Sequence, residues 1–396
     1  MKLLFLHPNF PGQFNRPAAM LASKGHRIVF LCHYHHGRAM AGVEVVRLKG
    51  ELGGEAVEKK NKKAFEKSIE IGFQYFQAME KLKGNGFFPD IIISHSGWGC
   101  GLHSLVVWPN ARRISYLEWW FDKNCKLYEF GAKSKWMPAR NFTINERLRN
   151  SPLSLELVEA DIIISPTEWQ KRQLPKQLQI SCRVISDGVN LKRYAPDEKK
   201  EKKEKILLTY GTRGMEPMRG FPEFIEELEE VLVSFPSLEV EIAGDDRIVY
   251  DGSAPQGYTS YKTWAEDHLS KFITKKRIAF IGLLQFEEYQ KWLRNSTVHV
   301  YLTRPFVASW SLLEAMASGC AIIASNTEPV KEFLTSDEAI LVDYREPGWL
   351  KKSLVKLIND ERLSNRLSKN ARLKSLEYSA EITLRKWEGL IEELRK

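Results

Sequence analysis

Residues 300–319 have the sequence VYLTRPFVASWSLLEAMASG, which combines the end of a strand, a loop and the start of a helix. The short apolar run ends near Leu302, a loop containing proline follows, and an apolar helical pattern begins between Ser309 and Ser311. An apolar run of this length, followed by a helix, is typical of a buried parallel strand and its crossover connection. This stretch therefore predicts an α/β architecture with helices covering a parallel sheet.

The same alternation of apolar runs and amphipathic stretches extends along the chain. Predicted strands occupy residues 2–7, 27–32, 43–47, 90–94, 113–117 and 161–165, and a second series occupies 206–210, 238–243, 278–281, 298–302, 321–324 and 339–342. A charged run at 196–205 that begins with proline separates the two series, as a linker does. We therefore predict two doubly wound, Rossmann-like domains that face each other across a cleft, 1–190 and 191–378. The final helix, 379–396, has no strand after it and can cross back to the first domain.

Composition narrows the class of protein. The chain has 396 residues, 43% of them hydrophobic and 28% charged, which is the balance of a folded protein and excludes a disordered one. Lys+Arg 59 minus Asp+Glu 50 gives a net charge of +9, which favours an acidic partner such as a phosphate-bearing ligand. The five cysteines lack CxxC spacing, and no apolar run approaches the ~18 residues of a membrane span. We expect a cytoplasmic protein without structural zinc or disulfides.

A basic loop follows the predicted strand 206–210. Residues 211–220 have the sequence GTRGMEPMRG, which places Arg213 and Arg219 six positions apart in a loop rich in glycine. Guanidinium groups suit diphosphate oxygens and keep their charge at any working pH. The alternative is that both arginines are ordinary solvated side chains.

The helix start in the opening stretch is a second candidate anion site. Backbone amides around Ser309, Trp310, Ser311 and Leu312 would lack partners within the helix and would point towards an anion. An alternative interpretation applies to Glu314, because Ser311 to Glu314 also fits a capping box in which the glutamate only holds its own helix.

These two stretches resemble the family 4 glycosyltransferases, which have the two-domain GT-B architecture. Arg213 and Arg219 match the basic pair of that family, with arginine in place of the usual lysine at the second position. Residues 312–319, LLEAMASG, match its donor-site helix, and residues 7–14, HPNFPGQF, resemble a bacterial subgroup. The resemblance implies transfer of a sugar from a nucleotide-diphospho-sugar, with UDP as the default nucleotide, to a hydroxyl group of a glycan, lipid or protein acceptor.

The resemblance also implies a hexosyltransferase that retains the anomeric configuration and needs neither a cofactor nor a divalent metal. Arg213, Arg219 and the helix start can do a cation's work by neutralising the departing diphosphate. Residues Thr212, Ser309, Trp310, Ser311, Leu312 and Glu314 are the implied donor contacts. Phe306 stands where the family usually has a first glutamate, eight positions before Glu314, that touches the donor sugar. The donor sugar is therefore left unspecified.

Candidate acceptor residues follow strands of the first domain. His95 ends one predicted strand, and Glu118 follows the next, where the family often has a histidine. An imidazole or a carboxylate there can bind an acceptor hydroxyl or take its proton. The alternative for His95 is a buried histidine with all its bonds satisfied. Gly12 permits close approach of the backbone to a ligand, or forms an ordinary tight turn.

Other activities and partners remain open at this stage. A sugar-nucleotide epimerase or a phosphorylase shares the architecture, and Phe306 allows a catalytically silent nucleotide-sugar-binding protein. Lysines at 59, 60, 62, 63 and 67 fit either peripheral contact with an anionic membrane or a solvated helix face. His33, His35 and His36 lack further metal ligands at suitable spacing. We expect no nucleic acid partner, because the positive charge is not gathered into one patch.

Overall fold

The computed structural model describes residues 1–50, 64–136, 141–196, 206–250 and 252–395. The chain divides into two compact units. Unit 1 consists of Met1–Cys125, Asn141–Asp187 and Ala380–Lys396, and unit 2 consists of Lys126–Arg140 and Gly188–Ser379. Within the described chain, no helix combines the length and the apolarity that crossing a bilayer requires.

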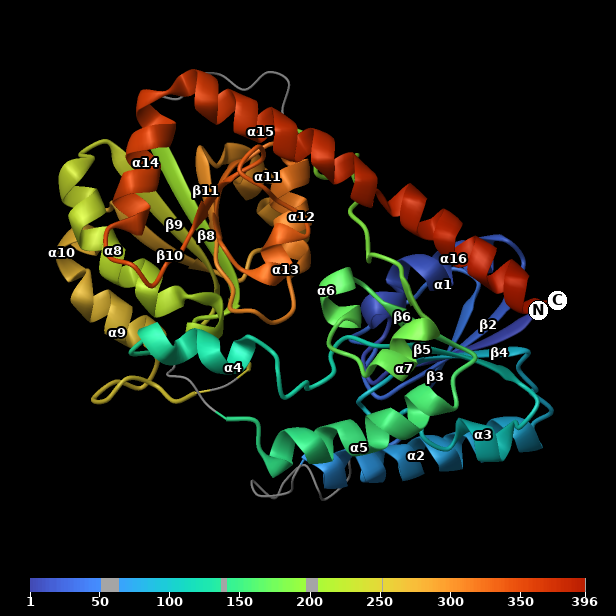
Figure 1. Ribbon diagram of the computed structural model, residues 1–396. Helices are drawn as coiled ribbons and strands as arrows, with labels where there is room; N and C mark the ends of the chain where they lie inside the picture. The colour runs from blue at the N-terminus through green and yellow to red at the C-terminus, as the bar shows by residue number, and fades with distance from the viewer. Residues whose placement is uncertain (51–63, 137–140, 197–205, 251, 396) are drawn as a thin grey trace. The chain divides into compact units, whose positions relative to one another are not determined.

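Unit 1 is built on a parallel sheet with the strand order β3-β2-β1-β4-β5-β6-β7 (Figure 1). The strands are β1 (Lys2–Leu6), β2 (Arg27–Cys32), β3 (Val43–Arg47), β4 (Ile91–His95), β5 (Arg112–Tyr116), β6 (Ile162–Ser165) and β7 (Cys182–Val184). The helices are η1 (Gly12–Phe14), α1 (Asn15–Ser23), α2 (Ala64–Gly84), α3 (Ser104–Val107), α5 (Ile144–Val158), α6 (Glu168–Lys171), α7 (Lys176–Ile180) and α16 (Ala380–Arg395). The strand order reverses between β1 and β4, where open sheets of this kind bind ligands.

Alternation along β1 explains how this sheet is covered on both faces. Leu3 and Phe5 belong to an apolar cluster that α1 and α16 also enter, the latter with Trp387 and Ile391. Leu4 and Leu6 belong to a different cluster, which contains side chains of α2. Because successive strand residues point to opposite faces, a strand that is apolar at every position requires helices on both sides.

Unit 2 repeats this plan with the parallel order β10-β9-β8-β11-β12-β13 (Figure 1). Its strands are β8 (Ile206–Gly214), β9 (Leu238–Asp245), β10 (Ile278–Gly282), β11 (Val298–Tyr301), β12 (Ala321–Ser325) and β13 (Ile340–Val342). Its helices are α4 (Leu127–Phe130), η3 (Gly131–Lys133), η4 (Pro217–Arg219), α8 (Phe221–Ser234), α9 (Tyr261–His268), α10 (Ser270–Thr274), α11 (Phe286–Asn295), α12 (Trp310–Ala317), α13 (Glu328–Lys331), α14 (Trp349–Asn359), α15 (Glu361–Ser375) and η5 (Leu376–Tyr378). The order reverses between β8 and β11, which pair at Thr209 and His299.

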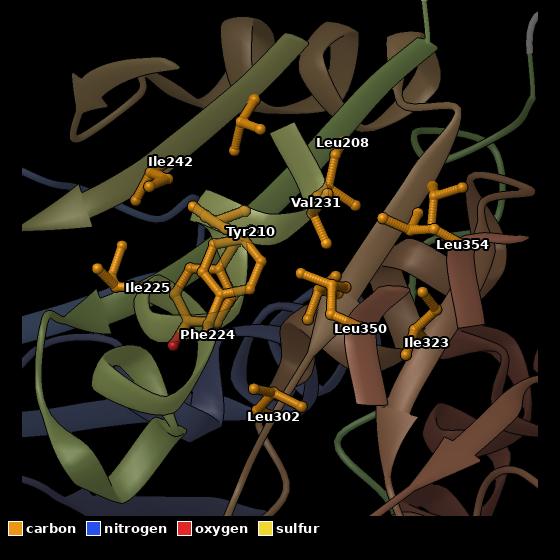
Figure 2. Close-up of a cluster of buried hydrophobic side chains, with 14 of the residues drawn as sticks. Leu208, Tyr210, Phe224, Ile225, Val231, Ile242, Leu302, Ile323, Leu350 and Leu354 are labelled. Carbon is orange, nitrogen blue, oxygen red and sulfur yellow. The ribbon is translucent and has the colours of Figure 1, made fainter. Parts of the chain in front are cut away.

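The core of unit 2 fixes the loop that leaves β8. Figure 2 shows Tyr210 stacked on Phe224 of α8, and their ring centroids are 4.6 Å apart with an interplanar angle of 13°. Such a pair adds about 1 kcal/mol beyond the burial of its area. The Tyr210 hydroxyl donates a hydrogen bond of 2.7 Å to the carbonyl of Arg219. The packed core therefore sets the backbone position of one predicted site residue.

Unit 2 also takes a segment from the first half of the chain, residues 126–136. The ring of Phe130 lies 5.7 Å from that of Tyr344, and Arg345 donates to the Phe130 carbonyl at 2.8 Å. Trp136 packs 4.6 Å from Trp264, between ring centroids. We call residues 126–136 the strap, since the chain on both sides of it belongs to unit 1.

Candidate functional site

The two predicted arginines lie in different surroundings. Arg213 belongs to the end of β8, which continues to Gly214 where the sequence predicted a loop from residue 211, and its side chain is exposed. Arg219 is buried in η4, which follows β8. Thr212 donates to the Gly214 carbonyl at 2.7 Å and so shapes the backbone on either side of Arg213. Both arginines lie close enough to Glu216 for their charges to lower its pKa, although burial raises that pKa overall. Both guanidinium groups therefore lie within electrostatic range of Glu216.

Arg219 joins the loop after β8 to the loop after β11. Its Nη1 donates to the hydroxyl of Thr303 at 2.7 Å and to the carbonyl of Val307 at 2.9 Å. These acceptors lie on the segment that leads into α12, so the guanidinium points towards that helix start. The two loops flank the position at which the strand order of unit 2 reverses.

An aromatic pair lies beside this guanidinium. The Arg219 side chain stacks over the ring of Tyr250 at 5.2 Å, and its Nη2 donates to the Tyr250 hydroxyl at 3.2 Å. Tyr250 in turn meets Phe306 edge to face, with ring centroids 5.6 Å apart. Glu216 holds the loop after β9 in place, because it accepts hydrogen bonds from the amides of Val249 and Tyr250. Phe306 is thus half-buried against an aromatic ring.

The start of α12 differs from one interpretation of the sequence. Ser309 is the N-cap, its side chain makes no capping bond, and its amide donates to the Tyr301 hydroxyl at 2.7 Å. Ser311 lies inside the helix and bonds to the Ser309 hydroxyl at 2.5 Å. The capping box from Ser311 to Glu314 is therefore wrong, because the helix begins too early for it. Exposed Trp310 and buried Leu312 lie in the first turn.

Glu314 has a different partner, which lies on α11. It is half-buried and accepts a hydrogen bond from Tyr289, whose pKa burial and the glutamate's negative charge raise well above its usual value. Glu314 therefore lies between α12 and α11 and does not cap its own helix. A carboxylate placed here can accept hydrogen bonds from ligand hydroxyls.

A buried ion pair connects the loop after β11 to the strap. Arg304 is 1% exposed and lies 3.6 Å from the carboxylate of Glu223. It also donates to the Ser134 hydroxyl at 3.1 Å and to the Pro217 carbonyl at 3.2 Å. Burial raises the pKa of Glu223, against the opposing effect of the arginine's charge. Sequence reasoning missed this pair, since Arg304 stood out from other loop arginines only by its place between a strand and a proline.

In unit 1, the loop after β1 is organised by a neutral histidine. His7 Nδ1 accepts from the Asn9 amide, and Nε2 donates to the side-chain oxygen of Gln13, both at 2.9 Å. Burial, followed by the nearby His95, lowers the pKa of His7 to about 3. Gly12 has φ +52, and a Cβ there would lie 2.7 Å from His7 Nε2. The close approach of Gly12 in this structure is thus to His7, a residue that sequence analysis quoted without assigning it a role.

His95 and Glu118 lie together, at the ends of the neighbouring strands β4 and β5. His95 is 2% exposed, and its Nε2 is 3.4 Å from an oxygen of the half-exposed Glu118 carboxylate. The Nδ1 atom bonds to the Ser96 carbonyl at 3.1 Å, so Nδ1 carries the proton in the neutral ring. The ring stands perpendicular to that of His7, with centroids 4.9 Å apart. His95 is therefore buried as one alternative proposed, yet its Nε2 makes no hydrogen bond with any residue the structure describes.

Two other groups weighed in the sequence take no part in these clusters. His33 bonds to Gln74 at 2.9 Å, and His35 bonds to the Gly37 amide. Lys67 is half-buried on α2, whereas the lysines at 59, 60, 62 and 63 lie outside the described residues.

Comparisons with known proteins agree with this geometry. Residues 24–194 match the family described as "Glycosyl transferase family 4 group", and residues 192–374 match "Glycosyl transferases group 1". Sucrose-phosphate synthase from Thermosynechococcus elongatus is similar in structure, with a TM-score of 0.73 at 17% identity over 99% of this chain and 98% of that one. HepE of Anabaena in complex with UDP gives a TM-score of 0.69 at 14% identity, over 99% and 100% of the two chains. The chain therefore has the two-domain GT-B fold that these glycosyltransferase structures share.

Two curated relatives are similar to parts of this chain. A phosphatidyl-myo-inositol mannosyltransferase of Propionibacterium freudenreichii is 27% identical over 165 residues, which is 40% of this chain. An uncharacterised glycosyltransferase of Methanocaldococcus jannaschii is 23% identical over 248 residues, or 60% of this chain. The matched regions span 36% and 59% of these relatives' own lengths. Together with the two family matches, they place the chain in family 4 of the glycosyltransferases.

Proposed function

We propose that this protein transfers a hexosyl group from a UDP-sugar to a hydroxyl group of its acceptor, with retention of configuration and without a divalent metal. The observation that carries the proposal is the position of buried Arg219, which bonds to the loop leading into α12. A guanidinium and a helix start are the two protein groups that best bind a diphosphate. UDP in the HepE structures supports uridine as the base.

In the proposed reaction, the bond between the anomeric carbon and the diphosphate breaks while a bond to the acceptor oxygen forms. The negative charge that builds on the leaving diphosphate is neutralised by Arg213, Arg219 and the amides at the start of α12. These groups supply the charge that a metal ion supplies in other transferases, and this is the physical reason for proposing a metal-free reaction. Retention follows from the resemblance to the family.

Unit 1 is proposed to handle the acceptor hydroxyl. Nε2 of His95 lies beside the Glu118 carboxylate without the geometry of a hydrogen bond, so a hydroxyl group can bond to both. The carboxylate then accepts the proton that the acceptor oxygen loses, which is ordinary general-base chemistry. We propose a glycan, lipid or protein hydroxyl as the acceptor, and a cytoplasmic location with peripheral contact to anionic membrane through the lysines of 59–67.

The test is a nucleotide-release assay with UDP-, ADP- and GDP-sugars, with and without acceptors and in the presence of a chelator. We expect UDP release that depends on the acceptor and survives chelation. Arg219→Ala should lower kcat/KM on the order of a hundredfold. The matched control is Arg366→Ala, at an exposed position on α15. Tight binding of UDP-sugars without release of UDP under any condition would instead identify a silent binding protein.

Membrane contact has its own measurement. Replacing the lysines at 59, 60, 62 and 63 with serine should reduce sedimentation with phosphatidylglycerol vesicles. Equal sedimentation of the variant and the wild-type protein would assign these lysines to a solvated surface.

A further inference from the structure

A buried carboxyl group lies beneath the turn that follows β4. Glu156 of α5 is 4% exposed, and its Oε2 accepts a hydrogen bond of 3.3 Å from the hydroxyl of Ser94. The backbone amides of Gly97 and Gly101 lie close enough to this carboxyl group to lower its pKa against the effect of burial. Polar groups from one stretch of chain thus surround a side chain that the proposed reaction does not use.

The turn that carries these amides has little freedom to move. Gly99 has φ +91, and a Cβ there would lie 2.0 Å from the backbone oxygen of Ser68 on α2. A Cβ on Gly101 would lie 2.6 Å from Glu156 Oε2. The turn is therefore held between α2 and α5, and glycine is needed at both contacts.

One peptide unit of this turn connects Glu156 to His95. The N–H of the peptide between Ser96 and Gly97 lies close enough to Glu156 to stabilise its negative charge, while the C=O of the same peptide accepts the hydrogen bond from His95 Nδ1 at 3.1 Å. Because both ends belong to one peptide group, a charge on Glu156 polarises the C=O as well. His95 Nε2, at the far side of the ring, is the atom beside Glu118.

We propose that Glu156 is a positioning residue that sets the tautomer and the basicity of His95 through the peptide unit between Ser96 and Gly97. An ionised Glu156 makes the peptide oxygen more negative, which strengthens the bond from Nδ1–H and raises the electron density at Nε2. A neutral Glu156 keeps the geometry and weakens this effect. The inference rests on the proposed function only in that His95 is taken to touch the acceptor.

The ionisation of Glu156 falls in an accessible range. Burial raises the pKa of Glu156 to about 8, against the hydrogen bonds from Ser94, Gly101 and Gly97. The other titratable groups near it are Glu159 at the C-cap of α5, Cys100 in the turn and Tyr75 on α2, which lies near Cys100. Burial raises the pKa of both Cys100 and Tyr75 well above their usual values, so both stay neutral near pH 8.

The groups around His95 do not compete with this transition. His7 is neutral, because burial lowers its pKa to about 3. The pKa of Tyr116 is well above its usual value because of burial and the negative charge of Asp187. Glu118 is half-exposed and belongs to the site itself. A change at His95 near pH 8 would therefore report the charge of Glu156.

The experiment follows the ring nitrogens of His95 by NMR in the full chain labelled with 15N-histidine. Their signals, assigned with His95→Gln, should shift in the wild-type protein with a midpoint near pH 8. Glu156→Gln, which mimics the neutral carboxyl, should abolish that shift, whereas Glu159→Gln should keep it. A shift near pH 8 that persists in Glu156→Gln, or one that is lost in Glu159→Gln, would overturn the proposal.

Kinetics provide the second readout. The wild-type kcat/KM should rise through pH 8, and Glu156→Gln should match the wild type near pH 7 but lack the rise. Glu156→Leu, which cannot accept from Gly97, should lose on the order of tenfold in kcat/KM at every pH, with KM for the donor unchanged. A profile for Glu156→Gln identical to that of the wild type would count against the proposal. An NMR shift that depends on Glu156, in a protein that turns over no sugar nucleotide, would support this inference and refute the proposed function.

Discussion

The two units place different kinds of side chain at the point where their strand order reverses. In unit 1, the titratable side chains of His7 and His95 lie at the ends of β1 and β4, and Glu156 is buried near the turn after β4. In unit 2, the groups that follow β8 and β11 are guanidinium groups, Arg219 and Arg304, whose charge is fixed. In the proposed reaction, the same topology moves a proton in one unit and neutralises an anion in the other.

Removing a fixed charge from unit 2 tests this comparison most strongly. Arg304→Met should lower the free energy of unfolding by about 4 kcal/mol, because it leaves Glu223 as a buried charge without its cation. Urea unfolding followed by fluorescence measures the change. The double variant Arg304→Met/Glu223→Gln should recover part of it. A loss no greater in the single variant than in the double variant would mean that the pair contributes packing and not charge.

Acid should act on unit 1 through His7. Its pKa is about 3 in the folded state against an ordinary value of 6.5, so the unfolded chain takes up the proton first as the pH falls. The stability from this group is complete above pH 6.5 and is lost towards pH 3, at about 1.4 kcal/mol per pH unit. His7→Asn should reduce the loss between pH 7 and pH 4 by about 3 kcal/mol.

Urea unfolding at several pH values measures this dependence. His268→Asn, at an exposed position on α9, is the matched control and should behave like the wild-type protein. An acid dependence of His7→Asn as steep as that of the wild-type protein would show that His7 is already protonated or that its loop opens first.

Measurements of thermal stability should distinguish the role of Arg213 from that of Arg219. Arg219→Ala and Arg213→Ala should each remove about 3 kcal/mol of transition-state stabilisation, which lowers kcat/KM on the order of a hundredfold. Only Arg219→Ala should also lower the melting temperature, since only Arg219 is bonded to Thr303 and Val307. Steady-state kinetics and calorimetry on both variants check this. Near-normal rates in both would remove the argument for diphosphate binding.

Glu314→Gln should give the smallest effect. Since α12 is not capped by this residue, the melting temperature should stay the same, while UDP binding should weaken by about 1 kcal/mol through the loss of a charged acceptor. Titration calorimetry with UDP measures the change, and Tyr289→Phe controls for the loss of the bond between the two side chains. A lower melting temperature with unchanged UDP affinity would contradict the binding role.

The sequence was sufficient for the sheets because the central strands, such as β1 and β12, are apolar runs buried on both faces. All twelve predicted strands are present, within a few residues of their expected ends. β7 was missed because it has three residues, Cys182–Val184, one of them a charged arginine, and it lies at the edge of its sheet. A short edge strand needs little apolar pattern, so periodicity gives almost no signal for it.

The candidate site was predictable only where local sequence determines position. His95 and Glu118 were each predicted at the end of a strand, and the structure brings them together because β4 and β5 are neighbours in a parallel sheet. Glu156 was missed because it lies on a helix rich in polar residues, and only packing against the turn after β4 makes it buried. The contact of Tyr250 with Phe306 joins residues 56 positions apart, which no local pattern contains.

The strap and α16 determine when each unit can finish folding during synthesis of the chain. The chain passes between the two units four times, at residues 125, 140, 187 and 379. Unit 1 has Trp387 and Ile391 in its core, so its last structural element leaves the ribosome only after all of unit 2 has been synthesised. A fragment that ends near residue 190 would lack that helix and would carry the strap without the aromatic side chains that bury it. Neither unit can therefore be obtained intact as a contiguous piece of the polypeptide.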